Sequence, residues 1–139
     1  MSKWNSTEND VLSLFFLKTL PAWAGTLSLT GDTNITVALH TADPWEAGTQ
    51  STSEATYTSY ARVNVVRTAS GWTVAWNTSS NAALIQFPEA TGWADTITHV
   101  SLGVNSGQIM YSWALTASRS VSSGIQPQFN IGSLQVTED

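Results

Sequence analysis

The chain has 139 residues, a formal net charge of −5 at neutral pH and no cysteine. This length suits one domain with a single buried core. The acidic balance predicts no binding to nucleic acid or to an anionic membrane, because too few positive charges offset phosphate repulsion. The lack of cysteine excludes disulfides and thiolate chemistry.

Hydroxyl groups supply much of the polar surface. Charged residues make up 11% of the chain, against about 25% in an average soluble domain, whereas serine and threonine number 18 and 19. An apolar content of 42% excludes a disordered acidic tail. The apolar stretch from Val11 to Leu20 is short and is interrupted by Lys18. We therefore expect neither a targeting segment nor a membrane span.

One helix is predicted near the N-terminus. Ser6 and Thr7 are candidate N-caps, Glu8 and Asp10 suit the positive end of the helix dipole, and Pro21 blocks continuation. Its apolar residues cover more than one stripe, so the helix docks either on its own domain or on a neighbouring subunit.

The sequence pattern predicts β-structure for the remainder of the chain. Short stretches rich in alternating or β-branched residues are separated by turn residues, which predicts a jelly-roll-like antiparallel β-sandwich of about eight strands. Alternation around Val37 predicts a half-buried first strand. No repeat or linker interrupts the chain, so we predict one domain over 1–139, with a helix and arm over 1–30 and the sandwich over 31–139. The strands are expected at 35–40, 60–68, 72–76, 82–87, 96–104, 109–116, 120–122 and 129–136.

The segment 41–59 has no convincing periodicity. Structureless segments of this length are uncommon in compact domains and are often functional. It is either a packed surface loop or a contact loop in which Trp45 anchors a partner. Arg62 starts the strand that follows and is placed to brace this segment.

Catalytic and metal-binding patterns are weak. His40 and His99 are the only histidines, and no nucleophile elbow accompanies them. His40, Asp43 and Glu46 lie three apart, as metal ligands do on a helix, but Pro44 indicates a turn that Asp43 braces through backbone N–H groups. No phosphate-binding or dinucleotide motif occurs. We expect no catalysis, no cofactor and no metal.

Seven tryptophans in so short a chain are the main compositional oddity. Tryptophans in strands fill cores, and tryptophans in loops stack on sugar rings or bury themselves in a protein partner. From strand parity and loop context, we assign Trp72, Trp76 and Trp113 to the core and Trp4, Trp45 and Trp93 to exposed positions.

Several segments carry a resemblance to a known family. They resemble small β-rich virion proteins of tailed bacteriophages, which are variously labelled tail-fibre-like proteins or capsid cement (decoration) proteins. The resemblance implies a jelly-roll-like sandwich that sits on a virion and catalyses nothing. The segments are Val37–Pro44, Gly48, Glu54, Tyr60–Val63, Asn81–Ala83, Phe87–Pro88 and Ala90–Thr91.

From this resemblance we expect a capsid cement protein on the capsid surface, assembled in the host cytoplasm. Its partners would be the major capsid protein and further copies of itself, as a dimer or trimer. A single small domain without repeats or heptads favours the head over a fibre. The alternative is a tail-fibre or baseplate component that binds a host receptor or glycan, and an enzyme acting through a histidine is a third reading. The candidate interface residues are Trp4, Trp45, Tyr57, Tyr60, Arg62 and Trp93.

Overall fold

The computed structural model describes residues 3–25 and 31–139. The chain divides into two compact units, each of which combines segments distant in sequence. That the chain forms a single domain remains a prediction, because this division does not test it. Part of the predicted arm (26–30) lies outside the described residues. The first unit is Met1–Thr33, Val66–Ile85 and Phe129–Asp139, and the second is Asn34–Val65 and Gln86–Gln128.

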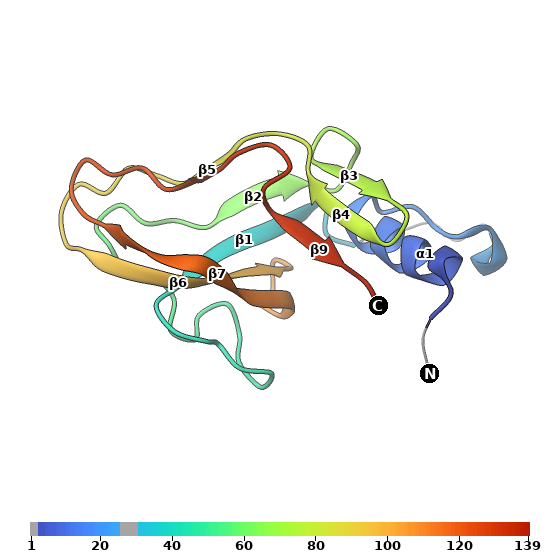
Figure 1. Cartoon of the computed structure of the whole chain (residues 1–139), viewed down its shortest axis with the longest axis horizontal. Helices are drawn as coiled ribbons and strands as arrows, with labels where there is room; N and C mark the ends of the chain where they lie inside the picture. The colour runs from blue at the N-terminus through green and yellow to red at the C-terminus, as the bar shows by residue number, and fades with distance from the viewer. Residues whose placement is uncertain (1–2, 26–30) are drawn as a thin grey trace. The chain divides into compact units, whose positions relative to one another are not determined.

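The residues that the structure describes form a mainly β fold, with antiparallel sheets and one α-helix near the N-terminus, consistent with the predicted β-sandwich class (Figure 1). In the described residues, no helix is long and apolar enough to cross a membrane. The elements are α1 (Asn5–Phe16), the 3-10 helix η1 (Ala22–Ala24), β1 (Asn34–His40), β2 (Val63–Val66), β3 (Trp72–Ala75), β4 (Thr78–Asn81), β5 (Ile85–Gln86), β6 (Asp95–Gly103), β7 (Ile109–Val121), β8 (Gln128–Phe129) and β9 (Gln135–Thr137).

Strand boundaries differ from the predicted ones where polar residues form strands. β4 was not predicted, because Thr78–Asn81 carries no apolar residue, yet it pairs with both β3 and β9. The predicted edge strand 120–122 is instead the end of β7. The predicted strand 60–68 contributes only β2 to the sheet.

In the first unit, α1 packs against β3 and β4, which confirms a helix docked on its own chain. Phe16 lies against the buried Trp72, with ring centroids 4.7 Å apart. The helix begins after Trp4, without a side-chain cap, so the predicted capping by Ser6 or Thr7 is wrong. It ends at Phe16, before Pro21, which was expected only to block its continuation.

Arg67 holds the C-terminal end of α1. Its guanidinium donates hydrogen bonds to the carbonyls of Leu14 (2.8 Å) and Phe15 (2.5 Å) and to the carbonyl of Asp32 (2.9 Å). It also lies 5.6 Å from the centre of the Phe15 ring. A cation that satisfies the last carbonyls of a helix is favoured by the helix dipole as well as by the hydrogen bonds.

We expect Arg67→Ala to lower the free energy of unfolding by about 2 kcal/mol, because three carbonyls lose a charged donor. Arg119→Ala is the matched control, since Arg119 is exposed on β7 and such surface changes stay within about 0.5 kcal/mol. Urea denaturation of both variants measures the difference. Equal stabilities would show that Arg67 does not hold the helix.

The second unit contains a four-stranded sheet in the order β2-β1-β6-β7. Because directly paired residues in an antiparallel ladder project to the same side, the register defines two faces. One face carries Val37 and Leu39 of β1 beside Leu102 and Val100 of β6. The other face is largely polar, with Thr36, Ala38 and His40 of β1, Ser101 and His99 of β6, and Ser112 and Ala114 of β7.

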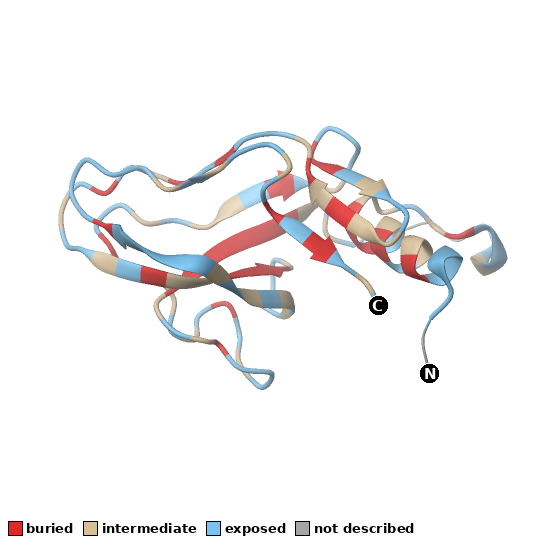
Figure 2. Ribbon diagram, viewed as in Figure 1, coloured by how far each residue is buried: buried red, intermediate tan, exposed pale blue. Residues whose placement is uncertain are grey.

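β1 is buried on both faces, from Ile35 through His40 (Figure 2). The prediction of a half-buried strand is therefore wrong. Its polar residues are covered by the segment 41–59, which folds back over them. Local alternation in the sequence cannot reveal such a cover, because it depends on contacts across the sheet.

Candidate functional site

Buried polar side chains fasten the segment 41–59 to the sheet. One ring nitrogen of His40, Nδ1, lies 2.9 Å from the carbonyl oxygen of Thr52, and the other, Nε2, lies 2.7 Å from Oγ of Ser101. A carbonyl oxygen only accepts hydrogen bonds, so Nδ1 carries the proton and Nε2 accepts from the serine hydroxyl. This arrangement satisfies a neutral imidazole at both nitrogens. Burial also lowers the pKa of His40.

Gln50 is the second anchor of this segment. Its side chain is fully buried, and its amide donates to the carbonyl of Thr36 at 2.7 Å. Its backbone N–H bonds to the carbonyl of Gly107 at 2.9 Å. A Cβ atom on Gly103 would lie 2.7 Å from the Gln50 side chain, so the glycine provides the room that Gln50 occupies.

A third anchor closes the other end of the segment. Arg62 donates two hydrogen bonds to the Glu54 carboxylate, at 2.6 and 2.8 Å, and one to the Ser51 hydroxyl at 2.9 Å. The Tyr60 hydroxyl donates to the same carboxylate and accepts the Leu39 N–H. This confirms the prediction that Arg62 braces the long segment. The paired carboxylate raises the pKa of Arg62, and burial raises that of Tyr60.

Between these anchors, residues 43–48 form a tight turn. The Asp43 carboxylate accepts the backbone N–H of Trp45 at 2.9 Å, as its position before Pro44 predicts. The N–H of Gly48 bonds to the carbonyl of Trp45 at 3.1 Å. A Cβ atom at Gly48 would lie 1.8 Å from the Pro44 carbonyl oxygen, so only glycine fits there.

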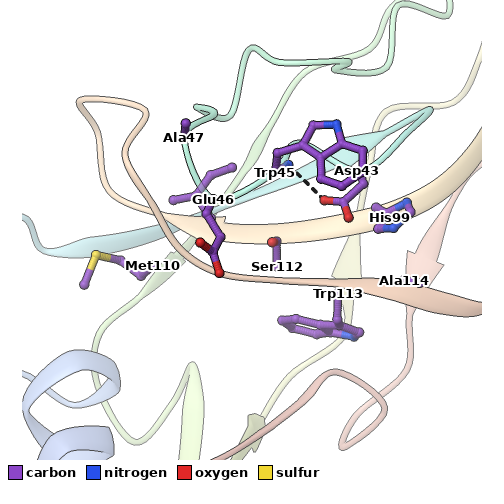
Figure 3. Close-up of a pocket in the computed structure, with 10 residues that line it drawn as sticks. Asp43, Trp45, Glu46, Ala47, His99, Met110, Ser112, Trp113 and Ala114 are labelled. Atoms are coloured by element: carbon purple, nitrogen blue, oxygen red, sulfur yellow. Dashed lines mark hydrogen bonds between the residues drawn. The ribbon is translucent and has the colours of Figure 1, made fainter.

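This turn forms one wall of a groove over β6 and β7, with a volume of about 900 Å³. The side chains of Asp43, Trp45 and Glu46 extend from the turn, and those of His99 and Ser112 come from the polar face of the sheet (Figure 3). No lysine or arginine is among the described residues that line it. The full lining is Asp43, Trp45, Glu46, Ala47, His99, Ile109, Met110, Ser112, Trp113 and Ala114.

Trp113 borders the groove from the opposite face of the sheet. It pairs with Val100, whereas Ser112 pairs with Ser101, so the Trp113 ring points to the apolar face. Figure 3 shows its ring on the other side of β7 from Trp45. Trp45 is therefore the aromatic group that the groove presents, and it is 73% exposed.

Three exposed tryptophans share an unusual backbone conformation. Trp45, Trp76 and Trp93 have φ values of 58°, 57° and 21°, and each side chain is 73% exposed or more. A positive φ is uncommon for any residue with a side chain and is an outlier for a bulky one. Turn chemistry favours glycine or asparagine at such positions, so folding alone does not explain an indole there. Backbone strain clusters at functional sites, so it motivates the hypothesis that at least one of these side chains is kept for a contact.

The structure separates the six candidate interface residues into two groups. Trp4, Trp45 and Trp93 are exposed, as predicted, but only Trp45 lines the groove. Tyr57 is 1% exposed and donates from its hydroxyl to the Pro88 carbonyl, so its side chain belongs to the core of the second unit. Tyr60 and Arg62 meet at Glu54 and hold the segment in place. The use of these residues as an interface stays a prediction.

Comparison with known proteins identifies the family. The family model described as podophage GP4 fiber I protein gp80 matches residues 5–137. The chain belongs to this family. No curated protein matches the chain. The protein is thus a structural protein of the bacteriophage virion, as the resemblance indicated. The family description names a fibre and does not confirm the predicted capsid cement protein.

Two of the tryptophans assigned to the core of this virion protein lie elsewhere. Trp72 is buried, as predicted, but Trp76 is 78% exposed and Trp113 is only half-buried. β3 ends at Ala75, and Trp76 lies in the turn to β4, so strand parity no longer applies to it. Trp113 lies on β7, an edge strand that leaves one side of each residue open.

The metal-ligand reading of His40, Asp43 and Glu46 finds no geometric support. His40 uses both ring nitrogens inside the buried network, and Asp43 braces its own turn. Among the described residues, no cluster of three histidine or acidic side chains could hold a metal ion. Sequence reasoning missed Gln50 and Ser112 as site residues. Ser112 reaches the polar face only through the register of β6 and β7, and Gln50 reaches Thr36 only because the segment 41–59 folds back over β1.

The buried His40 predicts a pH dependence. The unfolded chain takes up a proton at this histidine near pH 6.5, whereas the folded chain, in which the pKa is lowered, takes it up at lower pH. Unfolding is therefore favoured as the pH falls below about 6.5. We expect the melting temperature to fall between pH 7 and about 5.5, and this fall to be absent in His40→Asn but retained in His99→Asn. Loss of the pH dependence in the His99 variant alone would contradict this assignment.

The positive φ of Trp45 predicts that its indole does not stabilise the fold. Asparagine tolerates this conformation better than tryptophan. We expect Trp45→Asn to leave the free energy of unfolding unchanged or to raise it by roughly 0.5–1 kcal/mol, measured by urea denaturation. Trp72→Ala, which empties a core position, should by contrast cost about 3–5 kcal/mol. A comparable loss in the Trp45 variant would assign its indole to folding.

Proposed function

We propose that this protein is a tail-fibre component of the virion and that the groove at Trp45 contacts the host cell surface. The observation that carries the proposal is Trp45 itself, an exposed indole at a positive φ on the rim of a groove. Its turn is fixed by Asp43 and Gly48, and its segment is fastened to the sheet by buried polar groups. The family description, which names a fibre, supports the same reading.

The role proposed is binding rather than catalysis. His99 is the histidine in the groove, and its Nδ1 lies 2.8 Å from the hydroxyl of the neighbouring Thr98. That hydroxyl is within reach of the ring, but nucleophilic catalysis also needs a third group that orients the base. Thr98 is the one hydrogen-bond partner of the His99 ring among the described residues. The groove offers instead an aromatic surface with hydrogen-bonding groups around it, an arrangement typical of recognition.

Capsid cement remains the second candidate, with the major capsid protein and further copies of the chain as partners. Exposed aromatic side chains such as Trp4 and Trp93 suit protein interfaces as well as host contacts. The two candidates differ in copy number. A capsid shell offers many equivalent sites, on the order of hundreds, whereas fibres are few.

Location and adsorption test the proposal together. We expect immunogold label at the tail fibres and a low copy number per virion by quantitative mass spectrometry. Virions carrying Trp45→Ala should adsorb to host cells at least about 10-fold more slowly, since an anchor side chain contributes about 2 kcal/mol or more. Virions carrying Trp76→Ala are the matched control, because that tryptophan has a similar exposure and backbone conformation but does not line the groove.

Label over the head at a copy number of hundreds would establish the cement reading instead. Normal adsorption of the Trp45 variant, with the protein still in the virion, would overturn the host contact. Equal melting temperatures of the two purified variants exclude misfolding as the cause of a defect.

A further inference from the structure

We infer that the groove binds a saccharide without acidic groups, one ring of which stacks on the indole of Trp45. This inference rests on the proposed function and adds the chemical class of the ligand. Three features of the groove restrict the chemistry of the ligand: the exposed indole, the hydrogen-bonding side chains and the negative charge.

The exposed indole of Trp45 favours a ligand with a flat apolar surface on which it can stack. Trp45 presents its ring on the rim of the groove instead of burying it among core side chains. Aromatic side chains supply a large apolar contact at small entropic cost. The C–H face of a pyranose ring is flat and apolar and has hydroxyls at its edge, so it suits an indole with polar groups nearby.

The polar groups of the groove require a ligand that donates hydrogen bonds. The carboxylate oxygens of Asp43 and Glu46 are hydrogen-bond acceptors. Oδ1 of Asp43 already accepts the Trp45 N–H, so more acceptor capacity is left for a ligand at Oδ2. The Ser112 hydroxyl and the His99 ring can donate as well as accept. Sugar hydroxyls, which donate and accept, match this mixture.

The charge of the groove excludes acidic sugars. Two carboxylates and no lysine or arginine are among its described lining residues, and the whole chain carries a net charge of −5. A carboxylate or phosphate on the ligand would meet like charge with no cation to compensate it. A neutral sugar meets no such penalty, and an amino group on the sugar would be attracted.

The groove is built before the ligand arrives. Glycine at position 48, the Asp43–Trp45 hydrogen bond and the buried Gln50 fix the wall that carries the indole. A preformed site loses little conformational entropy on binding. Its volume of about 900 Å³ lies within the range of roughly 300–1,000 Å³ that small-ligand sites occupy, so it accommodates a short oligosaccharide.

Isothermal titration calorimetry of the full chain tests this inference. The probes are a neutral hexose oligomer (cellohexaose), an N-acetylated amino sugar oligomer (chitohexaose), its de-acetylated amino form (chitosan hexamer) and an acidic oligomer (oligogalacturonate). We expect binding of at least one of the first three and none of the acidic one. Calorimetry is chosen because removal of Trp45 would also remove a fluorescent reporter.

Three variants assign the binding to this groove. Trp45→Ala should weaken the affinity at least about 10-fold, and Glu46→Gln should weaken it several-fold while leaving the melting temperature unchanged, because Glu46 is exposed. Trp76→Ala should bind as the unmodified protein does. Equal affinity of the Trp45 and Trp76 variants would show that the ligand binds elsewhere and would overturn the inference.

Failure of the inference is distinct from failure of the proposed function. No heat with any uncharged or amino sugar at millimolar concentration, or binding of the acidic oligomer alone, overturns the saccharide class. If Trp45→Ala virions nevertheless adsorb poorly, the host contact stands with a different ligand. If saccharide binds but adsorption of those virions is normal, the saccharide site stands and the host contact does not.

Discussion

The segment 41–59 depends on a buried polar network, and the groove depends on that segment. His40 is paired at both ring nitrogens, with Thr52 and Ser101. The Gln50 amide group donates to the Thr36 carbonyl, while the buried Oε1 of Gln50 has no partner among the described residues. Buried polar groups are costly when unpaired and specific when paired, because few alternative arrangements satisfy them. The network therefore selects one path for a segment that has little regular secondary structure. The Asp43–Gly48 turn lies on that path, which is why Trp45 borders the groove over β6 and β7.

Stability and function make opposite demands on the exposed tryptophans. A bulky residue at a positive φ costs of the order of 1 kcal/mol or more, and an exposed indole adds little to a core in return. Trp45, Trp76 and Trp93 all occupy such positions, whereas Phe16 and Trp72 pack conventionally in the first unit. The rest of the chain tolerates this cost through well-satisfied elements such as the end of α1 at Arg67. The proposed contact at Trp45 would give the protein a reason to keep that side chain.

Local patterns predicted the elements, and non-local contacts decided the site. The β class, the docked helix, the Asp43 turn and the bracing by Arg62 all follow from short-range chemistry that the sequence displays directly. The cover over β1 does not, since Gln50 and Ser101 lie 51 residues apart and meet only because the segment 41–59 folds back over the sheet. For the same reason, Ser112 could not be assigned to the groove face, and the half-exposed Trp113 could not be separated from the core. The assignment of Trp76 to the core was wrong because β3 ends at Ala75, so strand parity does not extend to residue 76.

The central claim is that the segment 41–59 is fastened to the sheet, so that the groove exists in the free protein. Native-state amide hydrogen exchange tests this directly. The N–H groups of Gln50 and Ala55 bond to the carbonyls of Gly107 and Leu39, at 2.9 and 2.8 Å. They should exchange only through the opening that also exposes β1 and β6. Exchange of these two amides at the rate of an unstructured loop, while the strands stay protected, would contradict the claim.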